Sequence, residues 1–389
     1  MAFKFHITSR DPKTRARAGL IETPHGIVQT PAFFPVGTLA SVKGVTPAGL
    51  RETGVEGILA NAWHLSERPG TGVVRRMGGI HRFMGWEGAV VTDSGGYQVF
   101  SLPKLLAVEE GGLIYRSPVD GAERELTPAG TLEIQKALGS DIAMVLDQPV
   151  PYPSDRAASE AALRRTTTWA SASRANPLSE NAFAIVQGGF YADLRRRSAE
   201  ELARLDFPGY AVGGLRLGEP LETALAMLAA VMPVLPEDKP RYIMGMGGLR
   251  DMAEAVALGA DFFDCVLPTR NGRNGMAFTA LGTFQIRNAR FREDDSPLEP
   301  GCPCYACRTF SRGYLRHLFM ENEMLGAMML TLHNLRVYAS WMERLRAAIR
   351  EGRLETILAD IRRAWPAEGG SRRESGAEGG KTANQENGK

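Results

Sequence analysis

Three cysteines and one histidine near the carboxyl-terminal end have the types and spacing of metal ligands. Cys302, Cys304 and Cys307 share one short turn, and His333 lies in an apolar stretch farther along. Thiols this close are poorly placed to bridge one another, whereas three thiolates and one imidazole are the ligand set of a tetrahedral structural zinc site. We therefore predict one structural Zn²⁺ per subunit. The alternative is free core cysteines beside a surface histidine. A closed site leaves no position for water, so catalytic residues are expected elsewhere.

Carboxylate and amide side chains stand at the ends of apolar segments elsewhere in the chain. Asp93, Asp147 and Gln187 end three such segments, and Asp264 lies in a fourth. A carboxylate and an amide together match the donors and acceptors on the edge of a flipped guanine. Asp264 follows two phenylalanines, and partial desolvation among such neighbours favours a nucleophilic role. Glycine pairs after Ser94 and at Gly213-Gly214 allow the backbone to approach a ligand closely.

Eight short apolar segments are typical of parallel strands that are covered on both faces. They occupy residues 32–36, 57–61, 89–93, 141–147, 182–187, 209–213, 241–245 and 261–266. Helical segments lie between them, and two open with a capping hydroxyl followed by proline, at Thr46-Pro47 and Thr127-Pro128. This alternation predicts a (β/α)8 TIM barrel with its active site at the carboxyl ends of the strands. A doubly wound sheet is the alternative, but its glycine-rich first turn is not found.

The composition divides the chain into three parts. Residues 1–296 hold the predicted catalytic barrel, and residues 297–365 hold the zinc-binding subdomain with long helices such as 310–323. Residues 366–389 form a tail, and from residue 367 onward it contains no aliphatic residue larger than alanine. Such a segment cannot bury a core, so we expect it to be disordered.

Composition and cysteine usage indicate a globular protein of a reducing compartment. The chain has 389 residues, of which 44% are hydrophobic and 23% charged, and its net charge is +2. Three of its four cysteines are clustered, which argues against a disulfide framework. The amino-terminal stretch lacks the apolar region of a signal peptide, and no segment is apolar for long enough to span a membrane. We therefore expect a cytoplasmic protein that does not contact membranes.

Arginines gather in the last third of the chain. One group comprises Arg270, Arg273, Arg287, Arg290 and Arg292, and a second comprises Arg308, Arg312 and Arg316. A solvated face explains either group alone. Two such groups beside a predicted zinc site favour a phosphate backbone as the partner.

Several longer motifs resemble the bacterial tRNA-guanine transglycosylase family, and the resemblance covers residues 3–365. The motifs are Thr92-Asp-Ser-Gly-Gly-Tyr-Gln98, Val186-Gln-Gly-Gly189, Tyr210-Ala-Val-Gly-Gly-Leu215, Tyr242-Ile-Met-Gly245, Phe263-Asp-Cys-Val-Leu-Pro-Thr-Arg-Asn-Gly-Arg-Asn-Gly275 and the Cys3His set. The resemblance implies a pentosyltransferase of queuosine biosynthesis, built as a (β/α)8 barrel with a zinc subdomain and assembled as a homodimer. It also implies exchange of guanine at wobble position 34 in tRNAs with a GUN anticodon (those for aspartate, asparagine, histidine and tyrosine). The incoming base would be 7-aminomethyl-7-deazaguanine (preQ1), and the exchange a double displacement through a covalent enzyme–RNA intermediate.

The resemblance also assigns roles to residues of this sequence. Asp264 is expected to be the nucleophile and Asp93 the general acid/base. Contacts to the base are expected from Asp93, Ser94, Tyr97, Asp147, Gln187, the Gly214 amide, the Leu215 carbonyl and Met244. Contacts to the RNA are expected from Arg270, Asn271, Gly272, Arg273 and Arg287.

Two positions bear on which base is accepted. Family members usually carry Asp-Glu-Cys where this chain has Asp147-Gln148-Pro149. Leu217 stands where the queuine-using enzymes place glycine, and a leucine there would crowd the larger base. We therefore expect preQ1, with queuine salvage as the alternative.

Three other functions remain to be weighed. A non-catalytic, zinc-bearing tRNA-binding subunit tends to lose the active-site aspartates, which this chain keeps. An archaeal-type transglycosylase should carry additional carboxyl-terminal RNA-binding domains. A zinc hydrolase built on a barrel needs a His-x-His pair, and the sequence has none among its six histidines.

Overall fold

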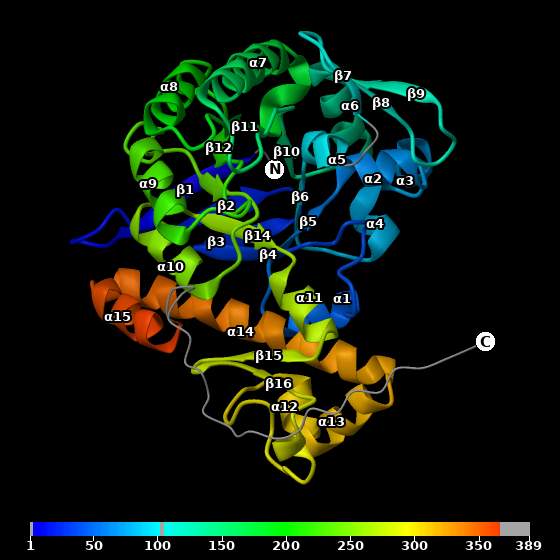
Figure 1. Ribbon diagram of the computed structural model, residues 1–389, viewed down its shortest axis with the longest axis vertical. Coiled ribbons are helices and arrows are strands. Elements are labelled where there is room, and N and C mark those ends of the chain that lie inside the picture. The colour runs from blue at the N-terminus through cyan, green and yellow to red at the C-terminus, as the bar shows by residue number, and fades with distance from the viewer. Residues whose placement is uncertain (1–2, 102–104, 366–389) are drawn as a thin grey trace, which may run out of the picture.

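Eight parallel strands form a closed barrel in the computed structural model, which describes residues 3–101 and 105–365 (Figure 1). The strands are β4 (Ala32–Pro35), β5 (Gly57–Ala60), β6 (Ala89–Thr92), β10 (Ile142–Met144), β11 (Ala182–Val186), β12 (Gly209–Val212), β13 (Arg241–Ile243) and β14 (Phe262–Cys265). Their hydrogen-bonded order is β4-β14-β13-β12-β11-β10-β6-β5, and a parallel bridge between Val36 and Leu59 closes the ring. The predicted TIM barrel and all eight of its strands are therefore confirmed.

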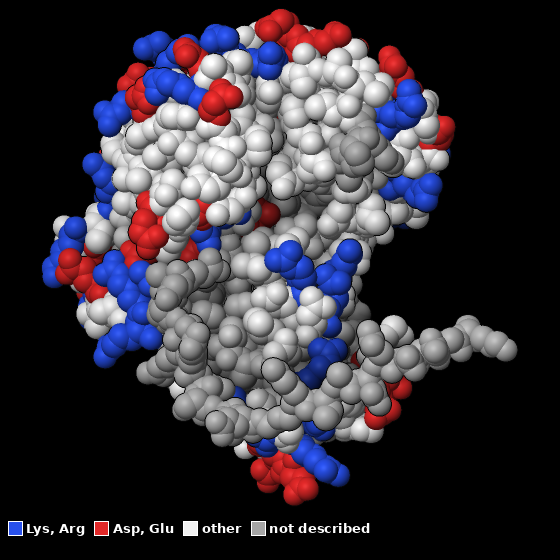
Figure 2. Space-filling model, viewed as in Figure 1, with Lys and Arg blue, Asp and Glu red and all other residues white. Residues whose placement is uncertain are grey.

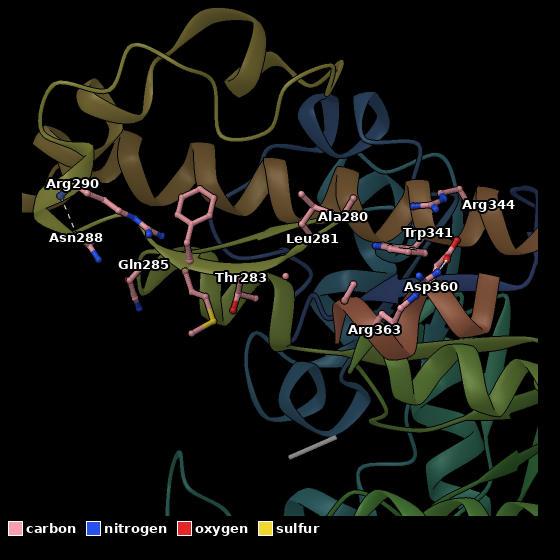
Figure 3. A pocket seen from close by; sticks show the side chains of 14 residues that line it. Ala280, Leu281, Thr283, Gln285, Asn288, Arg290, Trp341, Arg344, Asp360 and Arg363 are labelled. Carbon is pink, nitrogen blue, oxygen red and sulfur yellow. Dashed lines mark hydrogen bonds and ion pairs between the residues drawn. The ribbon is translucent and has the colours of Figure 1, made fainter. Parts of the chain in front are cut away.

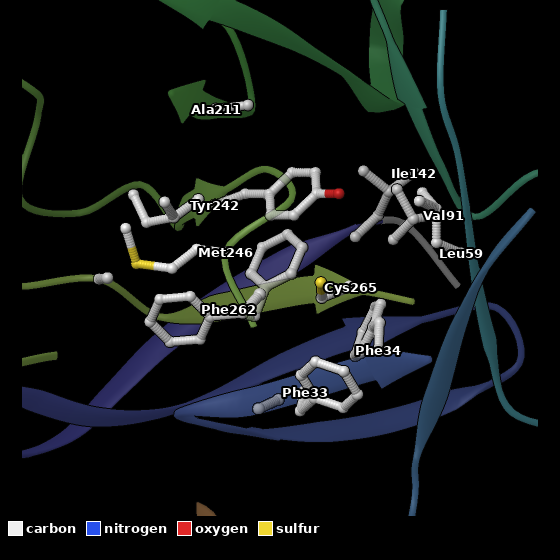
Figure 4. Packing of buried hydrophobic residues seen from close by; sticks show 14 of the residues in the cluster. Phe33, Phe34, Leu59, Val91, Ile142, Ala211, Tyr242, Met246, Phe262 and Cys265 are labelled. Carbon is white, nitrogen blue, oxygen red and sulfur yellow. The ribbon is translucent and has the colours of Figure 1, made fainter. Parts of the chain in front are cut away.

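The barrel strands are buried along their whole length and mostly apolar because both of their faces are covered. Helices cover the outside, and large side chains fill the inside, where Phe34, Tyr242 and Phe262 pack together (Figure 4). Glycines on neighbouring strands make room for these rings. A Cβ atom at Gly57 would lie 2.5 Å from the ring of Phe34, so this position tolerates no side chain.

The helices around the barrel begin and end at the expected signals. Thr46 caps α1 (Pro47–Glu52), and Thr127 caps α6 (Pro128–Leu138), which ends at the left-handed Gly139. The others are α2 (Ala62–Glu67), α3 (Thr71–Arg76), α4 (Gly79–Met84), α5 (Gly96–Ser101), α7 (Arg156–Arg174), α8 (Ala192–Ala203), α9 (Leu221–Val231), α10 (Leu249–Ala257) and α11 (Leu267–Arg273), with a 3₁₀ helix at Pro177–Asn181. No helix among the described residues is long and apolar enough to cross a membrane.

Two three-stranded antiparallel sheets were not foreseen from the sequence. One consists of β1 (Lys4–Arg10), β2 (Arg17–Thr23) and β3 (Gly26–Thr30), and the other of β7 (Leu105–Val108), β8 (Leu113–Arg116) and β9 (Glu123–Leu126). The first sheet is anchored to the amino-terminal ends of the barrel strands. There the buried Arg17 pairs with Asp261, at 2.6 Å between Nη2 and Oδ2, just before β14.

The carboxyl-terminal part packs against one side of the barrel through its longest helix. Its elements are β15 (Met276–Thr279), β16 (Gly282–Gln285), a 3₁₀ helix at Ala289–Phe291, α12 (Tyr305–Thr309), α13 (Arg312–Met320), α14 (Met324–Arg350) and α15 (Leu354–Ala364). Figure 1 shows α14 lying between the barrel and the part that carries α12 and α13. The helix expected at 310–323 is shorter, because Ser311 caps its start and Asn322 has a positive φ of 59° after its end.

No single position separates the barrel from the zinc subdomain in the described part of the chain. The hydrophobic cluster beside the cysteines already includes Ala277 and Ile286, and α14 contributes both to it and to the barrel core. The division at 296/297 therefore stays a prediction. The predicted disorder of the tail falls on residues 366–389, which lie outside the described residues.

Candidate active site and metal centre

Three carboxylates meet at the mouth of the barrel. Asp93 follows β6, Asp147 follows β10 and Asp264 lies in β14, and all three are buried. The charges of Asp264 and Asp147 both raise the pKa of Asp93, so the three groups are close enough to interact. The closed barrel thus brings together residues that are up to 171 positions apart in the sequence (264 minus 93).

Asp93 is held by donors from the neighbouring strand end. Its carboxylate accepts hydrogen bonds from the Asn61 side chain and, at 3.0 Å, from the backbone N–H of Ala62. Burial is the main cause that raises the pKa of Asp93 to about 7, with Asp264 and Asp147 adding to it. A carboxyl group with this pKa exchanges protons readily near neutral pH, as acid/base catalysis requires.

Asp147, Ser94 and Gln187 form a polar edge beside Asp93. Asp147 accepts hydrogen bonds from Ser94 Oγ at 3.2 Å and from Gln187 Nε2 at 2.7 Å, and burial raises its pKa to about 6. The buried Gln187 Oε1 has no hydrogen-bond partner among the described residues. A Cβ atom at Gly214 would lie 2.6 Å from that oxygen, so only glycine leaves it open. The edge therefore offers acceptor oxygens to the N–H groups of a planar ligand.

Asp264 is oriented through one of its two oxygens. Oδ1 accepts hydrogen bonds from the Tyr242 hydroxyl at 2.6 Å and from the Gly245 backbone N–H at 2.8 Å. Within the described part of the chain, no hydrogen bond reaches Oδ2. Burial raises the pKa of Asp264, while its two donors act in the opposite direction and favour the charged form. The arrangement fixes the carboxylate and leaves one oxygen free to react.

The side chain of Arg195 holds the backbone next to the polar edge in place. It was not predicted from the sequence. Its guanidinium is fully buried and donates to the carbonyl oxygens of Val186, Gly189, Gly213 and Gly214, at 3.1, 2.8, 2.6 and 3.0 Å. Burial lowers the pKa of Arg195 to about 10. The side chain thus ties the turn after β11 to the turn after β12. Its position in an ordinary helical segment gave no sequence signal.

The other residues expected to contact the base differ in how far they are exposed. Leu215 is buried and Met244 is half-buried, whereas Tyr97, on the first turn of α5, is 50% exposed. Gln148 faces α7, where its side chain accepts from Arg165 and its backbone N–H donates to Thr166 Oγ1 at 3.0 Å.

Of the residues expected to contact RNA, two arginines lie beside the mouth. Arg270 and Arg273 belong to α11, and Arg270 lines a cavity of about 620 Å³ that also includes Gly245 and Cys265. Figure 2 shows Lys and Arg side chains beside the hollow at the centre of this face, over α11 and α1. Exposed Lys43 was not singled out from the sequence. Burial lowers the pKa of His64, and the charge of Lys43 lowers it further.

The remaining three have other surroundings. Gly272 is buried, and a Cβ atom there would lie 2.8 Å from the Thr331 backbone, so it serves close packing against α14. Asn271 contacts Met276 through its side chain. Arg287 is exposed beyond β16, where it donates to the Asn274 carbonyl at 2.8 Å.

The predicted zinc ligands converge on one point. Nδ1 of His333 lies 3.6, 3.6 and 3.3 Å from the sulfur atoms of Cys302, Cys304 and Cys307. A tetrahedral zinc site has sulfur–nitrogen edges of about 3.6 Å, given its usual bond lengths. The other ring nitrogen, Nε2, lies 2.8 Å from the Phe278 carbonyl and donates to it, which leaves the Nδ1 lone pair for a metal. The four residues therefore fit a structural zinc ion.

A hollow of about 1090 Å³ lies between the β15–β16 hairpin, α14 and α15 (Figure 3). None of Asp93, Asp147 and Asp264 lines it. Its lining includes Leu281, Trp341, Arg344 and Arg363. The Arg344 guanidinium covers the Trp341 ring at 4.1 Å from its centroid. One face of the buried Trp341 indole is therefore already covered by a cation.

Comparison with known proteins connects this geometry to one family. Residues 11–367 match the family model described as queuine tRNA-ribosyltransferase. A protein of that name from Pelotomaculum thermopropionicum is 50% identical over 94% of this chain and 99% of its own length. Namesakes from Desulforamulus reducens and Solidesulfovibrio magneticus are 47% and 49% identical, over 94% and 90% of this chain and 100% and 95% of theirs.

Proposed function

The chain belongs to the queuine tRNA-ribosyltransferase family, and from this premise we propose which exchange it catalyses and how. The enzyme is a pentosyltransferase that exchanges guanine in tRNA. We propose that the guanine is that of wobble position 34 in GUN-anticodon tRNAs and that preQ1 replaces it. The observation that carries the proposal is the set of buried carboxylates at the mouth: one is oriented with a free oxygen, one titrates near neutral pH, and one is paired with an amide.

The positions of Asp264 and Asp93 support a double displacement. Oδ2 of Asp264 attacks C1′ of the ribose, the glycosidic bond breaks, and guanine leaves with a proton supplied by Asp93. The incoming base gives a proton to Asp93 and attacks C1′, which breaks the ester to Asp264. Two inversions give net retention, as in retaining glycosidases. The Tyr242 and Gly245 donors stabilise Asp264 as a carboxylate before attack and after release.

The polar edge supplies the recognition of the base. The open oxygen of Gln187 and the carboxylate of Asp147 accept from the N–H groups of a guanine-type ring, and the Gly214 amide donates to its carbonyl oxygen. Tyr97 and Met244 enclose the ring, and the Leu215 carbonyl meets the 7-substituent. Arg270 and Arg273 contact the anticodon backbone.

The wider assembly is proposed on the same basis. The Cys3His set would hold a zinc ion, which would fix α12 against α14. We also propose a homodimer that acts in the cytoplasm.

A competition between bases tests the proposed substrate. The full-length enzyme is incubated with unmodified GUN-anticodon tRNA and equal amounts of guanine, preQ1 and queuine, and the digested tRNA is analysed by mass spectrometry. We expect the aminomethyl base at position 34. Entry of queuine would reassign the enzyme to salvage, the alternative left open by Gln148-Pro149. The absence of any exchange would contradict catalysis and favour an accessory tRNA-binding subunit.

The nucleophile is tested with Asp264→Asn. The variant should bind tRNA but form no covalent adduct on a denaturing gel, because an amide cannot displace the base. Cys265→Ala, altered at the adjacent buried position, serves as the control and should still form the adduct. A covalent complex with Asp264→Asn would overturn the assignment.

A further inference from the structure

A second cluster of metal-binding side chains lies at the opposite end of the barrel from the active site. It consists of His25 in the turn between β2 and β3, His81 in α4 and Asp141 just before β10. Nδ1 of His25 lies 2.7 Å from Asp141 Oδ1, and Nε2 of His81 lies 3.0 Å from Asp141 Oδ2. The three potential ligand atoms all lie within 4.8 Å of one another.

Asp141 is a buried carboxylate to which no lysine or arginine is paired among the described residues. Its side chain is 1% exposed, and besides the two imidazoles it accepts from the Val90 backbone N–H at 2.9 Å. A buried charge is stable only when it is paired or coordinates a metal. The side chains that face it are two imidazoles, each of which can also bind a metal ion.

Asp261 is an equivalent buried carboxylate in the same barrel, and its charge is compensated in another way. It also precedes a barrel strand, and it accepts from a strand N–H, that of Arg241, at 2.7 Å. Its charge is balanced by the buried guanidinium of Arg17 from β2. Asp141 has the same strand contact, but the antiparallel sheet presents His25 to it in place of an arginine. Two imidazoles thus face Asp141 where one guanidinium faces Asp261, and imidazoles with a carboxylate form a ligand set for a metal ion.

From this comparison we propose that His25, His81 and Asp141 bind a divalent transition-metal ion, with Zn²⁺ the best match to two imidazoles and one carboxylate. This ligand set suits zinc and neighbouring metals, with a water as the fourth ligand. The ion joins the β2–β3 turn to α4 and the barrel and does for Asp141 what Arg17 does for Asp261. Its role is to hold the antiparallel sheet on the barrel, because the three ligands come from the β2–β3 turn, from α4 and from the residue before β10.

Binding requires one small movement. The two rings are stacked, with centroids 3.4 Å apart and an angle of 15° between their planes. One ion cannot lie in the planes of two parallel rings, so the rings must open before both nitrogens reach it. His25 is the ring that moves, because its side chain is 39% exposed in a turn, whereas that of His81 is 10% exposed.

The test is the zinc content of the full-length protein after dialysis against Zn²⁺ and then against a weak chelator. Elemental mass spectrometry should find two zinc ions per subunit in the wild type and one in His25→Gln and in His81→Gln. His25→Gln alters an exposed turn, so it remains informative if His81→Gln does not fold. His6→Gln is the matched control, because His6 also faces a carboxylate, Glu22, at 3.6 Å, but belongs to no group of three potential ligands among the described residues. It should keep both ions.

Cobalt distinguishes the two sites. At the Cys3His site Co²⁺ gives a strong thiolate charge-transfer band, whereas at the second site it should add only weak visible bands, and these should vanish in His25→Gln. Zinc should also raise the Tm of the wild type more than that of His25→Gln. A wild type with one zinc per subunit, or a second ion that both histidine variants retain, would overturn the proposal and leave the cluster as a hydrogen-bonded network.

Discussion

At the scale of single residues, Asp264 and Asp93 differ in the groups that donate hydrogen bonds to them. Asp264 accepts from a tyrosine hydroxyl and a backbone amide on the same oxygen, whereas Asp93 accepts from the Asn61 side chain and the Ala62 amide. Both are buried, and burial raises the pKa of each. Only for Asp93 do two other carboxylates add to the rise. These surroundings suit Asp264 to attack and Asp93 to carry a proton.

Replacing Tyr242 by Phe removes one donor from Asp264. A hydrogen bond to a charged group contributes about 1.5–3 kcal/mol, so we expect covalent adduct formation to slow by about 10–100-fold. The measurement is the single-turnover rate of adduct formation. Tyr210→Phe is the control, because Tyr210 is also buried but its hydroxyl contacts the Phe207 amide at the other end of the barrel. Equal slowing in both variants would contradict a specific role for Tyr242.

Asp93 should make the stability of the protein depend on pH. Its pKa is about 7 in the folded protein against 3.8 ordinarily, so the folded state binds the proton more tightly than the unfolded state does. The free energy of unfolding should therefore fall as the pH rises from about 4 to about 7 and then level off. Asp93→Asn removes this titration. The variant should gain stability relative to the wild type as the pH rises, by a few kcal/mol in order of magnitude, in urea unfolding at several pH values. A pH-independent difference would contradict the raised pKa.

At the scale of elements, the active site is a set of strand ends and the turns that follow them. The turns after β11 and β12 carry glycines with positive φ, Gly189 and Gly214, which bring the backbone close to the polar edge. Such turns are inherently flexible. Arg195, from the first turn of α8, holds both in place through their carbonyl oxygens. The geometry of the polar edge therefore depends on a side chain that has no place in the proposed chemistry.

Arg195→Met should loosen these turns. We expect the KM for the incoming base to rise at least tenfold in order of magnitude, while the KM for tRNA changes little, because the base edge and not the RNA face is disturbed. Arg195→Lys should recover part of the loss. Arg197→Met is the control, since Arg197 lies on the same helix but pairs with Glu160 and Glu201 near the surface. The measurement is steady-state kinetics with each substrate varied in turn. An equal rise in the KM for the base and the KM for tRNA would contradict this role.

At the scale of the whole molecule, two hydrophobic clusters share one helix. Leu330 and Leu332 of α14 belong to the cluster beside the cysteines, and Leu335 and Tyr338 belong to the barrel core. His333 lies between these two pairs and is fully buried. Loss of metal at the Cys3His set should therefore destabilise the barrel as well.

Cys304→Ala should lose zinc from the Cys3His set and lower the Tm by about 10 °C in order of magnitude, because zinc binding is coupled to folding. The measurements are zinc content and thermal unfolding followed by circular dichroism. Cys265→Ala removes another buried thiol and should keep the metal. Unchanged zinc content in Cys304→Ala would contradict the ligand assignment.

Local patterns were sufficient to predict much of this molecule. The barrel strands are read as continuous apolar runs because both of their faces are buried, and the starts of α1 and α6 are read from a threonine followed by proline. The antiparallel sheets were missed. Strand β1, for example, alternates between exposed and half-buried residues, and nothing in a single sequence tells which other strand pairs with it.

The sequence by itself determined the barrel, the zinc ligand set and the presence of aspartates at strand ends, because each of these rests on neighbouring residues or on longer motifs of a known family. Only the tertiary structure decided which oxygen of Asp264 is free, that Arg195 joins two turns, and that His25 and His81 meet at Asp141. The reason is physical. These contacts join residues far apart in the chain, and the pKa of Asp93 depends on burial and on neighbouring charges that exist only once the barrel has closed.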